Sequence, residues 1–519
     1  MRRGAAAVSL GEFLDSRRSA EPAIIHQQRA ISYAELADAS RRLAQGLRQL
    51  GIGAGDRVGI WLPNIPEWLT VYFACARLGA VAVAVNTRFR SAEVEDIVGR
   101  SRCKALVLWP SFKNIDFAGI LASVDPRALM ALEHVIVYGT SDERLLAGRR
   151  PVPFERLAES APLAEDIGTA ASPCTIFTTS GTTGLPKFVL HAQGGITRHA
   201  QEAAQAHGYT EPAARLLQIL PFCGTFGLTQ ALATLAAERC MVLQTVFDAA
   251  EAVALGRRYR VTHFNASDEM VARMLDASDD PRPLPDLRFC GYARFAGISG
   301  LIERAAARGV PMRGLYGMSE CQALFALQPA GDGERYALPG GVPASPEAAV
   351  RVCDPDTGAL CPPGEAGEIQ LRGPSLMLGY DGNAEATAAA FTADGYFRTG
   401  DIGYGTEDGG FVFTSRAGDV LRLGGFLVAP AEIERYLERH PAVEACAVVA
   451  GPAPGSCVAF VQPRDETSEA ALLAFCREGL ARFKVPARIH LLAELPSVPS
   501  PNGAKIRRNL LREWAEQWA

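Results

Sequence analysis

Short apolar runs alternate with helical stretches in the N-terminal part of the chain, and this alternation constrains the fold more than any other feature. Ser32, followed three residues later by Glu35, predicts a capping box that opens a helix, and Gly51 ends that helix. The strand-like run RVGIWL, a helical stretch at 66–78 and the apolar run AVAVAV at 80–85 follow. Such alternation is typical of βαβ units, so the sequence predicts a parallel sheet covered by helices on both faces.

The length and charge of the chain limit the possible architectures and ligands. With 519 residues it exceeds the size at which a single core stops growing, so we expect at least two domains, and a hydrophobic fraction of 48% is enough to fill them. The formal net charge of -5 provides no basic surface for nucleic acid. Any charged ligand must therefore be bound by local groups.

The cysteines and the N-terminus favour a cytoplasmic protein. The 12 cysteines form no CxxC pair and no Cys/His cluster, which argues against structural zinc and a disulfide framework and for a reducing compartment. Glu12 and Asp15 interrupt the segment after Arg2 and Arg3 before an apolar core of signal-peptide length, and no window approaches about eighteen uninterrupted apolar residues. We therefore expect no membrane and no nucleic acid among the partners, and the oligomeric state is open.

The stretch TTSGTTGLPK at 178–187 has the composition of a phosphate-binding loop. Glycines allow the backbone to approach an anion closely, amides and hydroxyls donate hydrogen bonds, and Lys187 adds a positive charge. The spacing GxxGxPK before Phe188 fails the Walker A pattern, and an ordinary Gly/Thr turn is the alternative. The loop residues that we expect at the phosphates are Thr179, Ser180, Gly181, Thr182, Thr183 and Gly184.

Four further motifs follow in order: GLYGMSE at 314–320, DGYFRTGDIGY at 394–404, SRAGDVLRLGG at 415–425 and PNGAKIRR at 501–508. Each alone could be a turn or a charged surface segment. Together with the phosphate loop they make the chain resemble the AMP-forming adenylating superfamily, which contains acyl-CoA synthetases, adenylation domains of peptide synthetases and luciferases. The resemblance covers nearly the whole chain and is closest to acyl- or aryl-CoA ligases.

The resemblance implies an α/β protein of two domains. Residues 1–415 would form a large N-terminal domain of two parallel-rich αβ sheets plus a small distorted β-barrel, and the dense turn residues after Leu338 agree with such a barrel. Residues 416–519 would form a small, mobile α+β lid, with Gly418 as the hinge. The lid would rotate between adenylation and thioester formation.

The resemblance also implies ATP, Mg²⁺ and coenzyme A as cofactors. Glu320 is then the magnesium ligand, Lys505 and Lys187 are the catalytic cations, Asp401 binds the ribose hydroxyls, and Arg416 lies near ribose and phosphate. The other nucleotide-binding positions implied are Gly291, Tyr292, Ala293, Tyr316, Gly317 and Ser319.

Two positions depart from the family's pattern. Gly224, in LPFCGTFGL at 220–228, stands where relatives carry an aromatic or histidine gate, so either a larger acid fits there or the glycine is a plain turn. Tyr292 replaces the usual second glycine of its segment. The residues that would line the acyl pocket are Cys223, Gly224, Thr225, Phe226 and Gly291.

The implied reaction has two halves. A small-molecule carboxylic acid attacks the α-phosphate of ATP and releases pyrophosphate, and the thiol of coenzyme A then attacks the acyl-adenylate. The alternative is a stand-alone adenylating enzyme that passes an unusual acid to a carrier-protein thiol or an amine. A luciferase-like oxidase would consume oxygen, and a purely nucleotide-binding protein would be expected to lack Lys505 or Glu320. The sequence leaves the acid (aryl, fatty or specialised), the acceptor and the lid conformation open.

Overall fold

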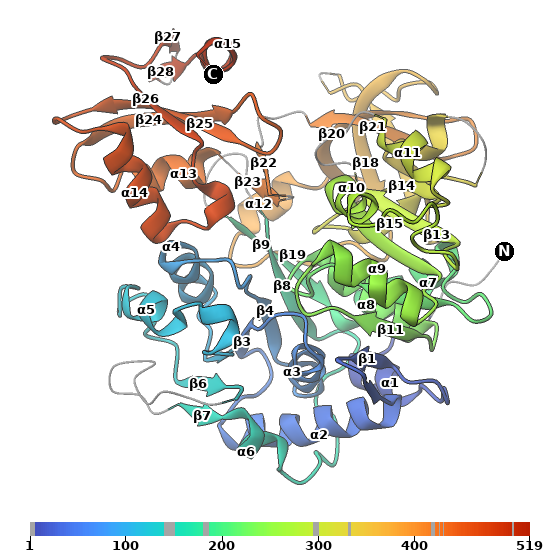
Figure 1. The fold of residues 1–519 in the computed structure, drawn as a ribbon. Helices are drawn as coiled ribbons and strands as arrows, with labels where there is room; N and C mark the ends of the chain where they lie inside the picture. The colour runs from blue at the N-terminus through green and yellow to red at the C-terminus, as the bar shows by residue number, and fades with distance from the viewer. Residues whose placement is uncertain are drawn as a thin grey trace.

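An eight-stranded, mostly parallel sheet lies at the centre of the large N-terminal domain (Figure 1). β3 (Arg57–Trp61) pairs in parallel with β4 (Val81–Ala84), and α3 (Pro66–Arg77) connects them, which confirms the predicted βαβ unit. β8 (Pro173–Thr179), the strand before the phosphate loop, lies beside β4, and β9 (Lys187–Ala192) returns antiparallel to it. The other strands of this sheet are β5 (Ala105–Leu108), β6 (His134–Val137), β7 (Val152–Pro153) and β19 (Gly379–Tyr380).

This computed structural model describes a large part of the chain. The described ranges are 6–139, 151–179, 186–293, 300–330, 334–355, 357–416, 421–424, 426–428, 430–500 and 503–518.

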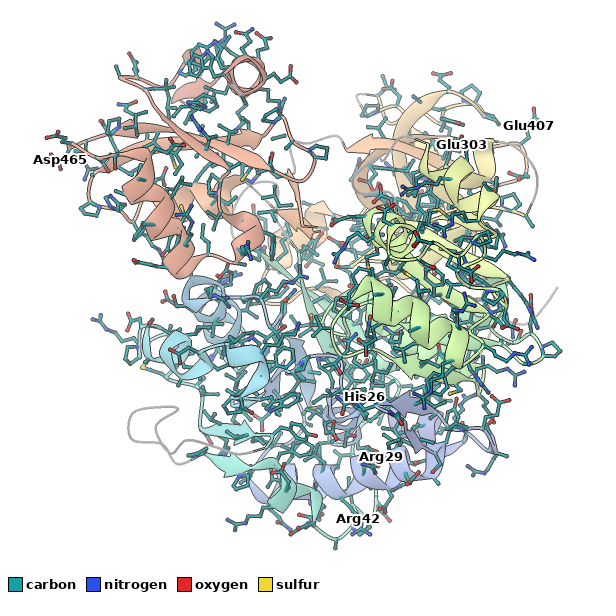
Figure 2. The ribbon with its side chains drawn as sticks, viewed as in Figure 1. His26, Arg29, Arg42, Glu303, Glu407 and Asp465 are labelled. Carbon is teal, nitrogen blue, oxygen red and sulfur yellow. The ribbon has the colours of Figure 1, made fainter. Side chains whose placement is uncertain are left out.

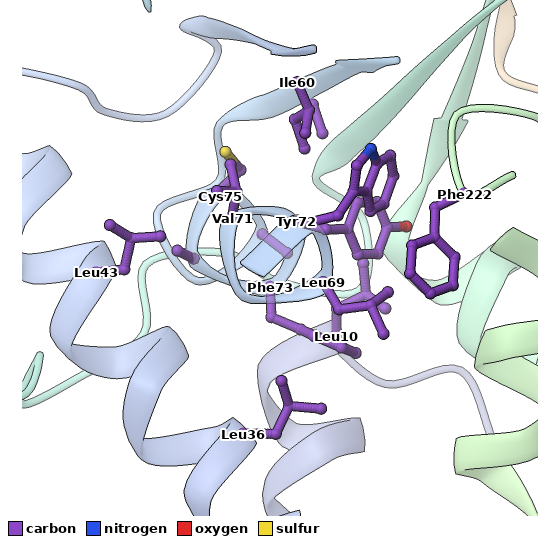
Figure 3. Packing of buried hydrophobic residues seen from close by; sticks show 14 of the residues in the cluster. Leu10, Leu36, Leu43, Ile60, Leu69, Val71, Tyr72, Phe73, Cys75 and Phe222 are labelled. Carbon is purple, nitrogen blue, oxygen red and sulfur yellow. The ribbon is translucent and has the colours of Figure 1, made fainter. Parts of the chain in front are cut away.

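A buried cluster joins this sheet to the N-terminal helices (Figure 3). At the start of α2 (Tyr33–Gln49), Ser32 Oγ accepts the Glu35 N–H at 3.1 Å and Glu35 accepts the Ser32 N–H at 2.7 Å, so the predicted capping box is confirmed. Phe222, from the loop before α8 (Thr225–Ala236), also packs in this cluster, with its ring centre 5.6 Å from that of Trp68. Because burying such a side chain contributes about 1.5–3 kcal/mol, the core holds this loop in place.

The second sheet of the large domain has thirteen strands and both parallel and antiparallel parts. β12 (His263–Ser267), β13 (Phe289–Ala293) and β14 (Met312–Met318) are parallel neighbours, and β14 turns back into the antiparallel β15 (Gln322–Leu327). The turn-rich stretch after Leu338 forms the antiparallel end of this sheet. The other strands are β1 (Ile24–His26), β2 (Arg29–Ile31), β10 (Arg215–Gln218), β11 (Cys240–Leu243), β16 (Gly340–Pro343), β17 (Ala349–Cys353), β18 (Ala366–Arg372), β20 (Phe397–Gly405) and β21 (Phe411–Arg416).

Helices cover both sheets, and exposed charged side chains such as Glu303, Glu407 and Asp465 mark the periphery (Figure 2). Within the described ranges, no helix is both long enough and apolar enough to cross a bilayer. The other α-helices of the large domain are α1 (Leu10–Asp15), α4 (Ser91–Val94), α5 (Phe117–Ala122), α6 (Phe154–Ala158), α7 (Gln193–Ala206), α8 (Thr225–Ala236), α9 (Ala249–Arg258), α10 (Asp268–Asp276), α11 (Leu301–Ala307) and α12 (Ala384–Ala389).

The small C-terminal domain, called the lid from here on, is a three-stranded sheet with two covered faces. Successive residues of a strand point to opposite faces. Val448 packs with α13 and α14, whereas Val449 packs with α15. Figure 1 shows α15, β27 and β28 on the side of the sheet away from α4 of the large domain. The elements are β22 (Leu421–Leu423), β23 (Phe426–Val428), α13 (Pro430–Leu437), β24 (Val443–Ala450), β25 (Cys457–Pro463), α14 (Glu469–Gly479), β26 (Arg488–Leu491), β27 (Ser497–Ser500), β28 (Gly503–Ile506) and α15 (Arg508–Gln517).

Helix α14 is shorter than the sequence predicts. The apolar spacing predicts that Leu480 and Phe483 continue its buried face, but the helix ends at Gly479 and Leu480 is extended, with φ -106° and ψ 147°. A Cβ atom at Gly479 would lie 2.0 Å from Tyr436 Oη, so the glycine allows α14 to end close against α13. Phe483 lies instead in a 3₁₀ turn, Arg482–Lys484, at the surface that faces the large domain.

Candidate active site

A cavity of about 2030 Å³ lies where the two sheets of the large domain meet the lid. β8, β14 and β20 all contribute to its lining, so residues from the phosphate-loop, GLYGMSE and TGD segments lie around one space. The predicted site residues that line it are Thr179, Lys187, Cys223, Gly224, Thr225, Phe226, Ala293, Tyr316, Gly317, Ser319, Glu320 and Asp401.

Other predicted site residues lie wholly or partly outside the described part of the chain. The backbone of Arg416 pairs with Asp401 between β20 and β21, and the backbone of Lys505 lies in β28, but neither side chain is described. The residues that lie wholly outside are Ser180, Gly181, Thr182, Thr183, Gly184 and Gly418.

Glu320 and Lys187 meet the same aromatic ring. Tyr380 Oη, from β19, donates a hydrogen bond to Glu320 Oε1 at 3.0 Å, and Lys187 Nζ lies 4.5 Å from the centre of the Tyr380 ring. The Glu320 side chain is buried but borders the cavity. The motif spacing gave no indication of Tyr380, because β19 reaches this place only through its pairing with β9.

The carboxylate of Glu320 fits a magnesium ion that arrives with a nucleotide. Within the described residues, no group of three or more acidic, histidine or cysteine side chains could hold a metal by itself. Mg²⁺ usually keeps several waters and takes one or two carboxylates together with the phosphate oxygens of its substrate. A single carboxylate beside a large cavity is therefore a sufficient protein contribution.

Asp401 and Tyr316 are joined across the cavity wall. Tyr316 Oη donates to Asp401 Oδ2 at 2.6 Å, and both side chains are buried. Asp401 follows Gly400, whose φ of 66° is a left-handed conformation that glycine adopts without strain. Asp401 from β20 and Tyr316 from β14 thereby bring a carboxylate and an aromatic ring into one region, which suits a ligand with both hydroxyls and a flat base.

The loop before α8 forms a wall with unfilled space at Gly224. Among the described residues, a Cβ atom added at this glycine would meet Pro221 O alone, at 3.6 Å, which is ordinary van der Waals contact. Asn64, whose sequence context indicates only a turn former, braces this loop. Its Nδ2 donates to Leu220 O at 2.9 Å and its Oδ1 accepts the Phe222 N–H at 2.8 Å. Gly224 is therefore a place where the wall could carry a side chain and does not.

The three predicted positions at the end of β13 point in different directions. Gly291 has no room for a side chain, because its Cβ would lie 2.1 Å from Asn265 Oδ1. The Tyr292 side chain is buried in the core cluster behind the sheet, and its Oη donates to Ala337 O. Of these three residues, Ala293 borders the cavity. The replacement of the family's glycine by Tyr292 therefore does not put its side chain in the cavity.

Three buried histidines hold the segment that carries Glu320, and the motif spacing did not reveal them. His191 Nε2 donates to Ser319 O at 2.7 Å, His199 Nε2 to Ala323 O at 2.7 Å, and His207 Nε2 to Leu324 O at 3.3 Å. Burial lowers the pKa of His191 to about 4, so its ring is neutral at pH 7. The same segment contains two buried residues other than glycine at positive φ, Gln322 (65°) and Leu324 (60°).

Cys223 is not an activated nucleophile. Burial raises the pKa of its thiol to about 12, so the thiolate is scarcely populated near neutral pH.

The lid presents one face to the cavity and carries the Lys505 hairpin on the other. Gly424, Val428, Tyr436 and Lys484 border the cavity, and all belong to the side of the lid that holds α13. The β27–β28 hairpin lies on the opposite side of the lid sheet, where Ile506 packs with α15 (Figure 1). For Lys505 to enter the cavity, the lid has to turn.

Comparison with known proteins gives matches over nearly the whole chain. The model of the AMP-binding enzymes matches residues 15–381, and that of the AMP-binding enzyme C-terminal domain matches residues 432–501. The chain is 31% identical to a methyl-dioxo-octahydroindenyl-propanoyl:CoA ligase of Mycobacterium tuberculosis, over 95% of each chain. It is 32% identical to the indoleacetate–CoA ligase of Aromatoleum aromaticum, over 98% of each chain.

A solved structure agrees with these sequence matches. A double mutant of the o-succinylbenzoate CoA synthetase of Bacillus subtilis, bound with a product analogue, matches with a TM-score of 0.80 and 25% identity. The match covers 98% of this chain and 99% of that one.

Proposed function

Because the chain belongs to the family of AMP-binding enzymes, we propose that its substrate is a bulky carboxylic acid that carries a ring. The chain is an AMP-forming ligase. It uses ATP to activate a carboxylic acid as the acyl-adenylate with release of pyrophosphate, and it transfers the acyl group to the thiol of coenzyme A.

The unfilled space in the cavity wall at Gly224 is the main support for a bulky, ring-bearing acid as the substrate. A side chain at this position would narrow the cavity, and its absence leaves space for a wide substrate. Apolar residues of the cavity lining, among them Leu220, Val246 and Met270, suit a hydrocarbon ring better than a charged group. The two relatives and the solved structure described above are named for acids that contain rings.

In the first half-reaction, the protein's role is to position the substrates and to balance charge. We assign Asp401 to the ribose hydroxyls, Tyr316 to the adenine, and Ser319 with Arg416 and the phosphate loop to the phosphates. Mg²⁺, held by Glu320, would neutralise charge on the phosphate oxygens. Lys187 and Lys505 are cations for the oxygens around the reacting phosphorus, where preorganised charge stabilises the transition state.

In the second half-reaction, the sulfur of coenzyme A forms a bond to the acyl carbon and the bond from that carbon to the AMP oxygen breaks. No side-chain nucleophile is required. We place the start of the lid at Arg416 and its hinge at Gly418. Rotation about this hinge would replace the Lys505 face by the α13 face at the cavity. A glycine hinge makes this rotation permissive for the backbone.

The experiment is a pyrophosphate-release screen with matched acids, each with and without coenzyme A. The series contains straight-chain acids, benzoate, indole-3-acetate and bicyclic propanoates, with the products identified by mass spectrometry. We expect acid-dependent pyrophosphate from ring-bearing acids and the corresponding acyl-CoA when the thiol is present. A preference for straight chains would contradict the assignment of the acid. Adenylate that accumulates with coenzyme A but is consumed by a carrier-protein thiol or an amine would favour the alternative acceptor.

A further inference from the structure

A buried ion cluster joins the lid to the large domain beside the cavity. Lys484 Nζ lies 2.8 Å from Glu432 Oε2 in the lid and 3.6 Å from Glu93 Oε1 in α4. Glu93 Oε1 also accepts the N–H of Ala481 from the lid at 2.8 Å. Lys484 is 6% exposed and Glu93 is 7% exposed, so both charged side chains are buried where the two domains meet.

Glu93 is held in position by its own helix. Its Oε2 accepts the Arg90 N–H at 2.9 Å at the start of α4, which leaves Oε1 directed at the lid. The ring of Phe89, from the same loop, lies 5.3 Å from Lys484 Nζ. The large domain therefore holds the Glu93 carboxylate in a fixed position where it can bind one lysine of the lid.

Burial and the neighbouring charges act in opposite directions on the pKa values of both groups in this contact. Burial raises the pKa of Glu93, and the charge of Lys484 acts in the opposite direction. Burial acts to lower the pKa of Lys484, but Glu432 and Glu93 outweigh it and raise the pKa, so this lysine is charged at neutral pH. Removing one partner of a buried ion pair leaves an uncompensated charge, which is more costly than losing an exposed ion pair.

We propose that Lys484, received by Glu93, is a positioning residue that fixes the lid in the orientation used for acyl transfer to the thiol. In this orientation the α13 face borders the cavity and the Lys505 hairpin lies on the far face, so the contact belongs to the step that does not use Lys505. The inference rests on the proposed two-step function. It adds a contact that must form and break in each turnover.

The test uses Lys484→Met in the full chain, with both half-reactions measured on one preparation. Transfer from supplied acyl-adenylate at saturating coenzyme A should fall about 10- to 100-fold, because the docked lid loses a buried charge contact. Pyrophosphate release should stay within about twofold, because the contact is absent when Lys505 is in the cavity. Lys484→Arg should restore part of the transfer rate.

A second set of variants separates lid positioning from folding and from direct contact with coenzyme A. Glu93→Gln changes the other domain and should reproduce the loss of transfer. In the double variant Glu93→Gln/Lys484→Met, the combined loss should be smaller than the product of the single losses, as expected for groups in contact. Arg488→Gln removes an exposed lid ion pair with Glu469, 3.2 Å long, and should change neither half-reaction.

Amide hydrogen exchange provides a readout independent of activity. Exchange over residues 478–485, which include the Ala481 amide bound to Glu93, should rise in Lys484→Met and Glu93→Gln. Unchanged transfer or equal loss of both half-reactions would overturn the proposal. A raised KM for coenzyme A with unchanged exchange would also overturn it and make Lys484 a ligand contact. If no acid yields adenylate with the unmodified chain, the proposed function fails, whereas the exchange measurement still tests the contact.

Discussion

At the scale of single residues, Asp401 is the position where removal of a few atoms should affect nucleotide use most directly. Asp401→Ala removes the acceptor that we assign to the ribose. The loss of two charge-assisted hydrogen bonds should raise the KM for ATP by a factor equivalent to on the order of 3 kcal/mol. The measurement is the KM for ATP, together with the melting temperature to show that the variant is folded. Tyr316→Phe, which keeps the ring and loses the hydroxyl bound to Asp401, is the matched control and should lose less. An unchanged KM for ATP in folded Asp401→Ala would remove Asp401 from the site.

Gly224 tests the acyl wall at the same scale. Gly224→His has room for its Cβ and should extend the imidazole into the cavity, so the largest accepted acid should be excluded by steric overlap while small acids remain substrates. The readout is kcat/KM for a small and a large acid in the same preparation. Equal losses for both acids would show that this position does not line the pocket.

At the scale of elements, buried histidines in β9 and α7 hold the turn before β15 and the first residues of β15, and this arrangement makes the fold acid-sensitive. The pKa of His191 in the folded chain is about 4, below its ordinary 6.5, because of burial. Its contribution to stability is therefore fully present above pH 6.5 and is lost as the pH falls toward 4. The total loss is about 3 kcal/mol for this one group.

His191→Gln retains an amide donor for Ser319 O but cannot titrate. Its free energy of unfolding should depend less on pH than that of the unmodified chain between pH 6.5 and 4, and denaturant titrations at several pH values measure this difference. His191→Leu, which also loses the donor, should be destabilised at every pH. Identical pH dependence in the unmodified chain and in His191→Gln would contradict the buried, neutral state of this ring.

Local signals account for the elements that the sequence predicts correctly. The capping box at Ser32 and the βαβ unit around α3 were readable because spacing and end residues are local properties. The end of α14 at Gly479 and the contact of Tyr380 with Glu320 could not be predicted from the sequence, because both depend on residues far away in the chain. Of the ordered motifs, those at 178–187, 314–320 and 394–404 contribute described residues to the cavity lining, whereas the Lys505 hairpin lies on the other face of the lid.

The detailed contacts within the cavity depend on three-dimensional packing. The sequence marked Tyr292 as a departure from the family's pattern, but only the pairing of β13 shows that its side chain lies behind the sheet. The contact between Lys484 and Glu93 joins residues from two domains, and no spacing rule connects them.

At the scale of the whole molecule, the lid has two covered faces, and they lie in different positions relative to the cavity. One face borders the cavity in the described structure, and the Lys505 hairpin lies on the other (Figure 1). A single active site can therefore serve two reactions if the lid turns between them. Rotation of the lid thus links the fold to both halves of the proposed chemistry.

Lys505→Ala tests lid rotation when adenylate formation and acyl transfer are measured on one preparation. Removing a preorganised charge contact should slow acid-dependent pyrophosphate release by about 10²- to 10³-fold. The variant should still transfer the acyl group of a supplied acyl-adenylate to coenzyme A at nearly the unmodified rate, because Lys505 lies away from the cavity in that orientation. Equal loss of the two rates would contradict a rotating lid, and no loss of either rate would show that the C-terminal motif takes no part in the chemistry.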